Sequence, residues 1–129
     1  MRRLRVAFGM YNEEMLSSNH FGDSAFYSIY DIYEDGSYVL VEHKENLAKN
    51  VVEAKHGDPR KFKAVVELLK DVDVLAAFRM GPNYLRIRDN SGKVPFITGT
   101  KKLSEALSRV AANFNRLWEE KQKKLNKVR

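Results

Sequence analysis

The chain has 129 residues, of which 43% are hydrophobic and 31% are charged, so one core beneath a densely ionised surface is expected. It contains no cysteine, which excludes a disulfide framework, a CxxC redox site and cysteine-bound zinc or iron–sulfur centres within the chain. No segment reaches the roughly 18 uninterrupted apolar residues of a membrane span, and the first residues lack the apolar stretch of a signal peptide. We therefore expect one cytoplasmic domain over residues 1–129.

The formal net charge of +6 is confined to the end of the chain. Residues 1–100 carry 14 basic and 14 acidic side chains, whereas residues 101–129 carry nine basic and three acidic ones. A nucleic-acid groove is expected to distribute basic residues over a folded face. A basic segment on a neutral body is more typical of a solvated helix end, so a nucleic-acid partner is not expected.

Three strands are expected in the first third of the chain. Residues 4–10 are mostly apolar, residues 25–33 are rich in aromatic and β-branched side chains, and residues 38–43 return after the Asp35-Gly36 turn. The polar segment 11–23 between the first two strands is predicted to be a loop.

Strands and helices alternate in the remainder. Asp58 is a candidate N-cap for a helix with Pro59 at its first position, and Thr100 is a candidate N-cap for the last helix. The segment 46–57 fits either a loop or a short irregular helix. The other predicted elements are a helix to about residue 71, a strand at 72–78, a helix from Pro82 to about residue 89, a strand at 94–98 with Pro95 at a sheet edge, and a long basic helix over about 101–126.

The order β-β-β-α-β-α-β-α predicts an α/β domain with a mixed five-stranded sheet and helices on both faces. This order resembles the ribonuclease H-like fold. With right-handed crossovers, the loops at 11–23, 46–58, 79–83 and 99–101 meet at one end of the sheet. Open α/β sheets bind ligands at the carboxyl ends of their strands, so we expect a ligand site there.

Two histidines, His20 and His56, fall in these converging loops, together with Gly22, Gly57, Gly81 and Gly99. Glycines permit a close backbone approach, and the starts of helices at the same end favour an anionic ligand. A structural interpretation stays open for each residue, because loop histidines often only donate a hydrogen bond and glycines often only form turns.

No motif for catalysis is present in the sequence. GxSxG, the P-loop, GxGxxG and HExxH are all absent. The first strand carries no acidic residue, which disfavours a two-metal nuclease. We therefore expect a binding protein rather than an enzyme.

A longer pattern resembles one known family. His20-Phe21-Gly22-Asp23-Ser24-Ala25-Phe26, followed by Ile29-Tyr30-Asp31-Ile32, is similar to the hallmark of the dinitrogenase iron–molybdenum cofactor biosynthesis proteins. The similarity covers about residues 4–110. It continues in three further segments, namely Arg5-Val6-Ala7, Asp73-Val74-Leu75 with Met80-Gly81-Pro82-Asn83, and Val94-Pro95-Phe96.

The resemblance implies a ribonuclease H-like α/β fold and the binding of an iron–sulfur-type or iron–molybdenum cofactor, or its precursor, as carried ligand. It also implies cluster donor or acceptor proteins as partners. His20 is the candidate metal ligand, since imidazole binds iron. The candidate binding residues are His20, Phe21, Gly22, His56, Gly57, Gly81, Pro82 and Asn83.

The sequence also departs from the family pattern. The glycine- and histidine-rich stretch before the first helix is reduced to His56-Gly57, Met80 stands where a small or β-branched residue is usual, and no cysteine offers a second ligand. The last helix is longer and more basic than is typical. Two alternatives therefore stay open: a module that binds another anion or a nucleotide at the same loops, and a protein or RNA partner held by the basic helix. The abundance of Lys and Glu also fits a thermophilic origin.

Overall fold

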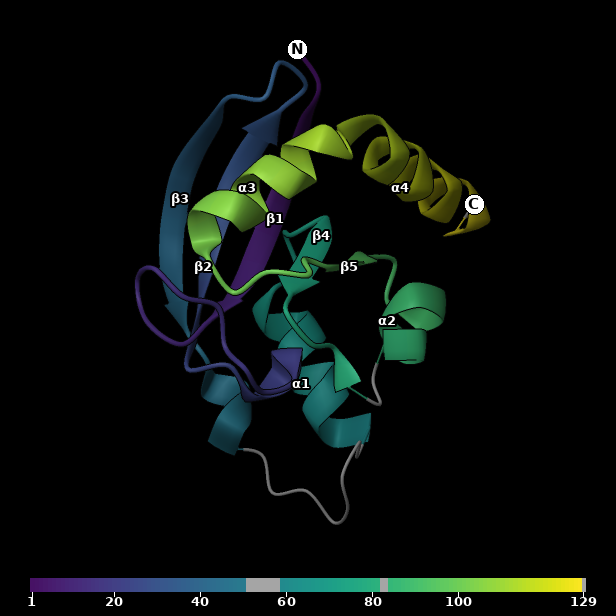
Figure 1. Ribbon diagram of the computed structural model, residues 1–129. Coiled ribbons are helices and arrows are strands. Elements are labelled where there is room, and N and C mark those ends of the chain that lie inside the picture. Colours follow the sequence, from purple (N-terminus) through teal and green to yellow (C-terminus); the bar gives the residue numbers. More distant parts are fainter. Residues whose placement is uncertain (51–58, 82–83, 129) are drawn as a thin grey trace.

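The computed structural model describes residues 1–50, 59–81 and 84–128. Its centre is a five-stranded sheet with the order β3-β2-β1-β4-β5 (Figure 1). The strands are β1 (Arg3–Met10), β2 (Phe26–Tyr33), β3 (Tyr38–Glu45), β4 (Val74–Ala77) and β5 (Val94–Ile97).

The sheet is mixed, as predicted. β2 is antiparallel to both β1 and β3, whereas β4 is parallel to β1 and β5 is parallel to β4. The tight turn between β2 and β3 contains Gly36 at a φ of 90°, a backbone conformation that favours glycine. Pro95 lies in the edge strand β5, where the missing N–H of proline is tolerated, so the prediction of an edge position is confirmed.

In the described residues, four α-helices and two short 3₁₀ turns complete the fold, and helices cover both faces of the sheet. α3 crosses one face in front of β1 and β2 (Figure 1). The helices are α1 (Pro59–Leu68), α2 (Tyr84–Asn90), α3 (Leu103–Ala112) and α4 (Phe114–Val128), and the 3₁₀ turns are η1 (Phe21–Asp23) and η2 (Leu47–Asn50).

Each face of the sheet carries its own hydrophobic core because side chains alternate along a strand. Leu4, Val6, Phe8 and Met10 of β1 point to the face covered by α3 and α4. Ala7 points to the other face, where Val65 of α1 and Ile87 of α2 are buried. From Val6 to Met10 the central strand β1 is therefore apolar on both sides, which explains the continuous hydrophobic sequence there.

The predicted single helix over 101–126 is wrong: two helices meet at Asn113. The backbone of Asn113 has φ −106° and ψ 14°, and its N–H donates to the carbonyls of Arg109 and Val110. The Asn113 side chain also donates to the Arg109 carbonyl at 2.8 Å, so it competes with the helical hydrogen bonds. α4 therefore leaves α3 at an angle and runs toward the side of the fold that holds α2 (Figure 1).

The prediction that Thr100 is the N-cap of the last helix is also wrong. The helix begins at Leu103 with Lys102 as N-cap, and no side chain caps it. The Thr100 hydroxyl instead donates to Glu105 Oε2 at 2.8 Å and accepts from the Lys102 N–H at 3.3 Å. The Leu103 N–H donates to the Glu14 carbonyl at 2.9 Å. A loop far away in the sequence therefore accepts a hydrogen bond from the first turn of α3, where a nearby capping side chain was expected.

Other boundaries differ by a few residues. α1 ends at Leu68 rather than at residue 71, and β4 is shorter than the predicted strand. The predicted N-cap Asp58 lies outside the described residues, as does the predicted helix start at Pro82. Within the ranges that the structure describes, no helix is both long and apolar enough to cross a membrane.

Candidate functional site

The predicted convergence of loops is found at the carboxyl ends of β1 and β4. His20 follows β1 along the chain, and Arg79 follows β4. The two residues form an isolated parallel β-bridge, which places the loop after β1 directly beside the loop after β4. The Leu16 N–H also donates to the Lys101 carbonyl at 2.7 Å, so the loop after β5 joins the same end.

The imidazole of His20 lies against the backbone of Gly81. A Cβ added at Gly81 would lie 2.4 Å from Cγ and 2.6 Å from Nδ1 of His20, closer than atoms can approach. Gly81 also has a φ of 74°, a conformation that L side chains rarely adopt. Glycine is therefore needed here for two independent reasons, and the structure brings together these two predicted site residues.

Phe21 anchors the segment rather than lining its surface. Its side chain is only 1% exposed and packs on Tyr27, with ring centroids 4.8 Å apart. The Phe21 carbonyl accepts hydrogen bonds from the Tyr27 hydroxyl at 2.9 Å and from the Ser24 hydroxyl at 2.8 Å. Burial raises the pKa of Tyr27, with a further contribution from the negative charge of Asp23. These contacts hold η1, and with it the backbone next to His20, in place.

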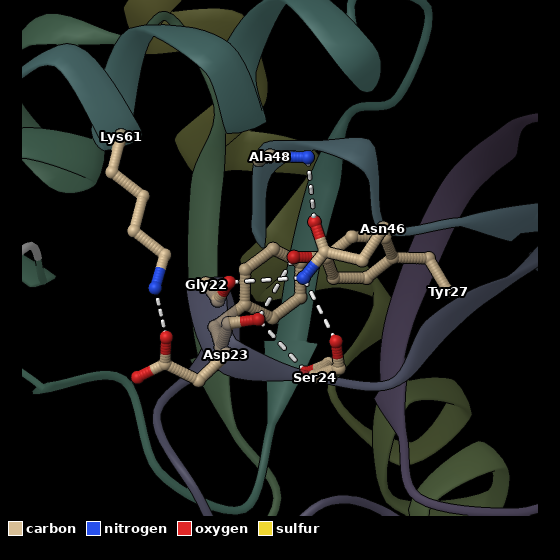
Figure 2. Close-up of polar contacts among 8 residues, drawn as sticks. Gly22, Asp23, Ser24, Tyr27, Asn46, Ala48 and Lys61 are labelled. Atoms are coloured by element: carbon tan, nitrogen blue, oxygen red, sulfur yellow. Dashed lines mark hydrogen bonds and ion pairs between the residues drawn. The ribbon is translucent and has the colours of Figure 1, made fainter. Parts of the chain in front are cut away.

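Asn46 joins η1 to the loop after β3, and sequence reasoning missed it. Figure 2 shows its amide nitrogen donating to the carbonyls of Gly22 at 2.9 Å and Ser24 at 2.8 Å. The Asn46 side-chain oxygen accepts the Ala48 N–H at 3.1 Å. The residue is 4% exposed, and a buried amide with all of its partners fixes the relative position of two loops. An isolated Asn at the end of a strand pattern gave no indication of this role.

Gly22 and Asp23 place η1 against α1. A Cβ at Gly22 would lie 3.7 Å from Val65 Cγ2, an ordinary contact, so the space at this glycine is not unusually tight. The Asp23 carboxylate forms an ion pair with Lys61 of α1 (Figure 2). The Lys61 side chain is 11% exposed, so this pair ties the first turns of α1 to η1 in a partly buried setting.

We name this arrangement the η1 junction: residues 20–24 with Tyr27, Asn46 and Gly81. Within the part of the chain that the structure describes, no group of three or more His, Asp or Glu side chains could hold a metal ion. The junction therefore offers a metal one imidazole, that of His20, which is partly exposed. Arg79, which pairs with His20 through its backbone, is an exposed residue.

Four predicted site residues lie outside the described residues, namely His56, Gly57, Pro82 and Asn83. Their roles stay predictions. The third histidine, His43, is exposed on β3, with Nδ1 3.0 Å from the Ser28 hydroxyl.

Two surface cavities in the described ranges lie away from His20. One, of about 300 Å³, is lined by α2, β5 and α4, and the other, of about 460 Å³, lies between residues 13–15, the β2–β3 hairpin and α3. Neither is lined by His20 or Gly81. The η1 junction thus presents its imidazole at a surface rather than in either of these cavities.

A family model described as "dinitrogenase iron-molybdenum cofactor" matches residues 2–113. The matched region contains the whole sheet and the η1 junction, and it ends at Asn113, where α3 ends. No curated protein matches the sequence.

Proposed function

The chain belongs to the dinitrogenase iron–molybdenum cofactor family, and from that membership we propose that it carries an iron–molybdenum or iron–sulfur-type cluster without catalysing a reaction. The cluster is cargo, received from one protein and passed to another. Cluster donor and acceptor proteins are therefore the partners that this function requires.

The single observation that carries the proposal is the contact between His20 and Gly81. The imidazole is held at the carboxyl ends of β1 and β4, the edge at which open α/β sheets bind ligands. Because the His20 ring packs against the Gly81 backbone, it has few orientations to lose when a ligand binds. This preorganisation favours a metal bond through a ring nitrogen of His20.

One protein ligand suits a carrier better than a complete ligand set. Imidazole binds iron well, but a cluster attached through one nitrogen keeps its remaining coordination positions open for the acceptor. The chain has no cysteine that could hold the cluster more firmly.

We assign the sheet to the ribonuclease H-like fold, on the order β3-β2-β1-β4-β5 with β2 antiparallel to its neighbours. Members of that fold that cleave nucleic acid use acidic residues on the first strand to hold two metal ions. β1 of this chain contains none, and its outward side chains include Arg3 and Arg5. This composition supports binding rather than metal-dependent hydrolysis.

The test is cluster uptake under anaerobic conditions. Purified protein is mixed with isolated iron–molybdenum cofactor or with a synthetic iron–sulfur cluster, separated from free cluster by gel filtration, and analysed for iron, molybdenum and visible absorbance. We expect about one cluster per chain in the unmodified protein and loss of uptake in His20→Ala.

His43→Ala is the matched control, since it removes an exposed histidine from β3 and leaves the η1 junction intact. It should bind the cluster as the unmodified protein does. Equal uptake by His20→Ala and His43→Ala would contradict the assignment of His20. No uptake by the unmodified protein would refute the carrier function.

A further inference from the structure

Half of the residues that line the cavity between α2, β5 and α4 are cationic. Arg88 from α2 and Arg116, Lys123 and Lys124 from α4 contribute four positive charges. Asp89 and Glu120 contribute two negative charges, so the lining carries a formal charge of +2. Such a balance complements a phosphate dianion.

Both acidic side chains of the cavity pair with an arginine of their own helix. Arg88 Nε lies 3.0 Å from Asp89, and Arg116 lies 3.2 Å from Glu120. All four side chains are at least 40% exposed, and exposed ion pairs of this kind contribute about 0–1 kcal/mol. A guanidinium can therefore exchange such a carboxylate for a phosphate group, to which it presents two parallel donors.

The cavity is preformed because α4 is firmly attached. Leu117 of α4 is fully buried in the core, and Lys121 forms an ion pair with Asp73 at 3.2 Å. The Lys124 ammonium group also donates to the backbone carbonyl of Arg88, which connects α4 directly to α2. The basic side chains thus converge without a rearrangement of the backbone.

We propose that this α2–α4 cavity binds the phosphoryl group of a small phosphorylated molecule. Its volume of about 300 Å³ lies at the lower end of the range for small-molecule pockets, and Tyr84 adds an aromatic side chain to the lining. A nucleoside monophosphate fits this lining, because its phosphate group matches the basic side chains and its base matches the aromatic side chain of Tyr84. The site is separate from the η1 junction, and α4 lies beyond the region that the family model matches.

The test uses inorganic phosphate, AMP and an eight-nucleotide RNA without terminal phosphate as probes, in calorimetric titrations at low and moderate salt. The double variant Arg88→Gln/Arg116→Gln removes both guanidinium groups. Lys63→Gln/Lys70→Gln, on α1 and the turn that follows it, removes the same charge from residues that do not line the cavity and is the matched control. Thermal unfolding of each variant verifies the fold.

We expect saturable binding of phosphate and AMP, weakened at least about tenfold in the arginine variant, reduced by salt, and unchanged in the lysine control and in His20→Ala. Equal loss in the lysine control would overturn the proposal, because it would show only attraction to the net charge. Binding of the RNA without binding of phosphate or AMP would also overturn it, as would no saturable binding of any probe. Since His20 is not involved, failure here leaves the carrier function untouched.

Discussion

The η1 junction and the α2–α4 cavity bind in physically different ways. The junction is densely packed, and its polar groups bond to one another: Asn46 links two loops, and the Phe21 carbonyl accepts two hydroxyl groups. The cavity is hollow, exposed and cationic. The junction lies within the family match, whereas the α4 side of the cavity lies outside it.

This difference shows how each region responds to change. The junction depends on shape, so one added methyl group can displace His20. The cavity depends on charge, so removal of basic side chains or addition of salt weakens it while the backbone stays in place. The contacts of α4 make the part of the chain beyond the family match an integral part of the fold, and the next prediction tests this.

The largest effect is expected for Leu117→Ala in α4. Leu117 is fully buried against the first core, and truncation of a buried leucine costs about 2–5 kcal/mol in the free energy of unfolding. The measurement is denaturant unfolding monitored by Trp118 fluorescence.

Leu125→Ala on the same helix is the control, because Leu125 is 48% exposed and should change the unfolding free energy by less than about 0.5 kcal/mol. Equal effects of the two substitutions would show that α4 is a loosely attached addition. In that case α4 would be a weakly packed cationic helix, in stronger contrast to the densely packed η1 junction.

An intermediate effect is expected for Gly81→Ala at the η1 junction. The new alanine must adopt a left-handed backbone conformation at a φ of 74°, and its methyl group collides with the His20 ring. The conformation alone costs about 1–2 kcal/mol, and displacement of the ring adds to this and abolishes cluster uptake. Unfolding and uptake are both measured.

Gly92→Ala separates the two causes. Gly92 has the same φ of 74°, but no atom lies within 4 Å of the added Cβ. This variant should lose only the conformational part of the stability and should retain cluster uptake. If the two alanine variants have the same stability and the same uptake, the contact between Gly81 and His20 does not position the imidazole.

The smallest effect is a dependence of stability on high pH through Tyr27. Burial raises the pKa of Tyr27 above its ordinary value of about 10, so above that pH the unfolded chain loses a proton that the folded chain retains. The contribution of Tyr27 to stability is fully present below a pH of about 10. Above that pH, Tyr27 lowers the unfolding free energy by up to about 1.4 kcal/mol per pH unit.

Tyr27→Phe should be less stable at pH 8, since the hydrogen bond to the Phe21 carbonyl is lost, but its stability should fall less between pH 10 and 11. Burial also raises the pKa of Tyr30, which contributes equally in both proteins, so the difference in slope isolates Tyr27. Parallel pH profiles would show that Tyr27 is not the buried anchor of the junction.

Much of the fold could be predicted because its determinants are local. A mostly apolar run of residues marked β1, and the Asp35-Gly36 turn marked the hairpin of β2 and β3. The handedness of crossovers then placed the loops of His20 and Gly81 at one end, although the sequence alone could not show that the ring and the glycine touch.

What the sequence determined by itself was the succession of strands and helices, because hydrophobic periodicity and turn residues act within a few positions of the chain. The tertiary structure decided the rest: the break at Asn113, the buried amide of Asn46 and the cavity between α2 and α4. These features depend on which surfaces meet across long sequence separations. Arg88 and Lys124 face one cavity because α4 packs through Leu117 onto the sheet, a contact that no local pattern encodes.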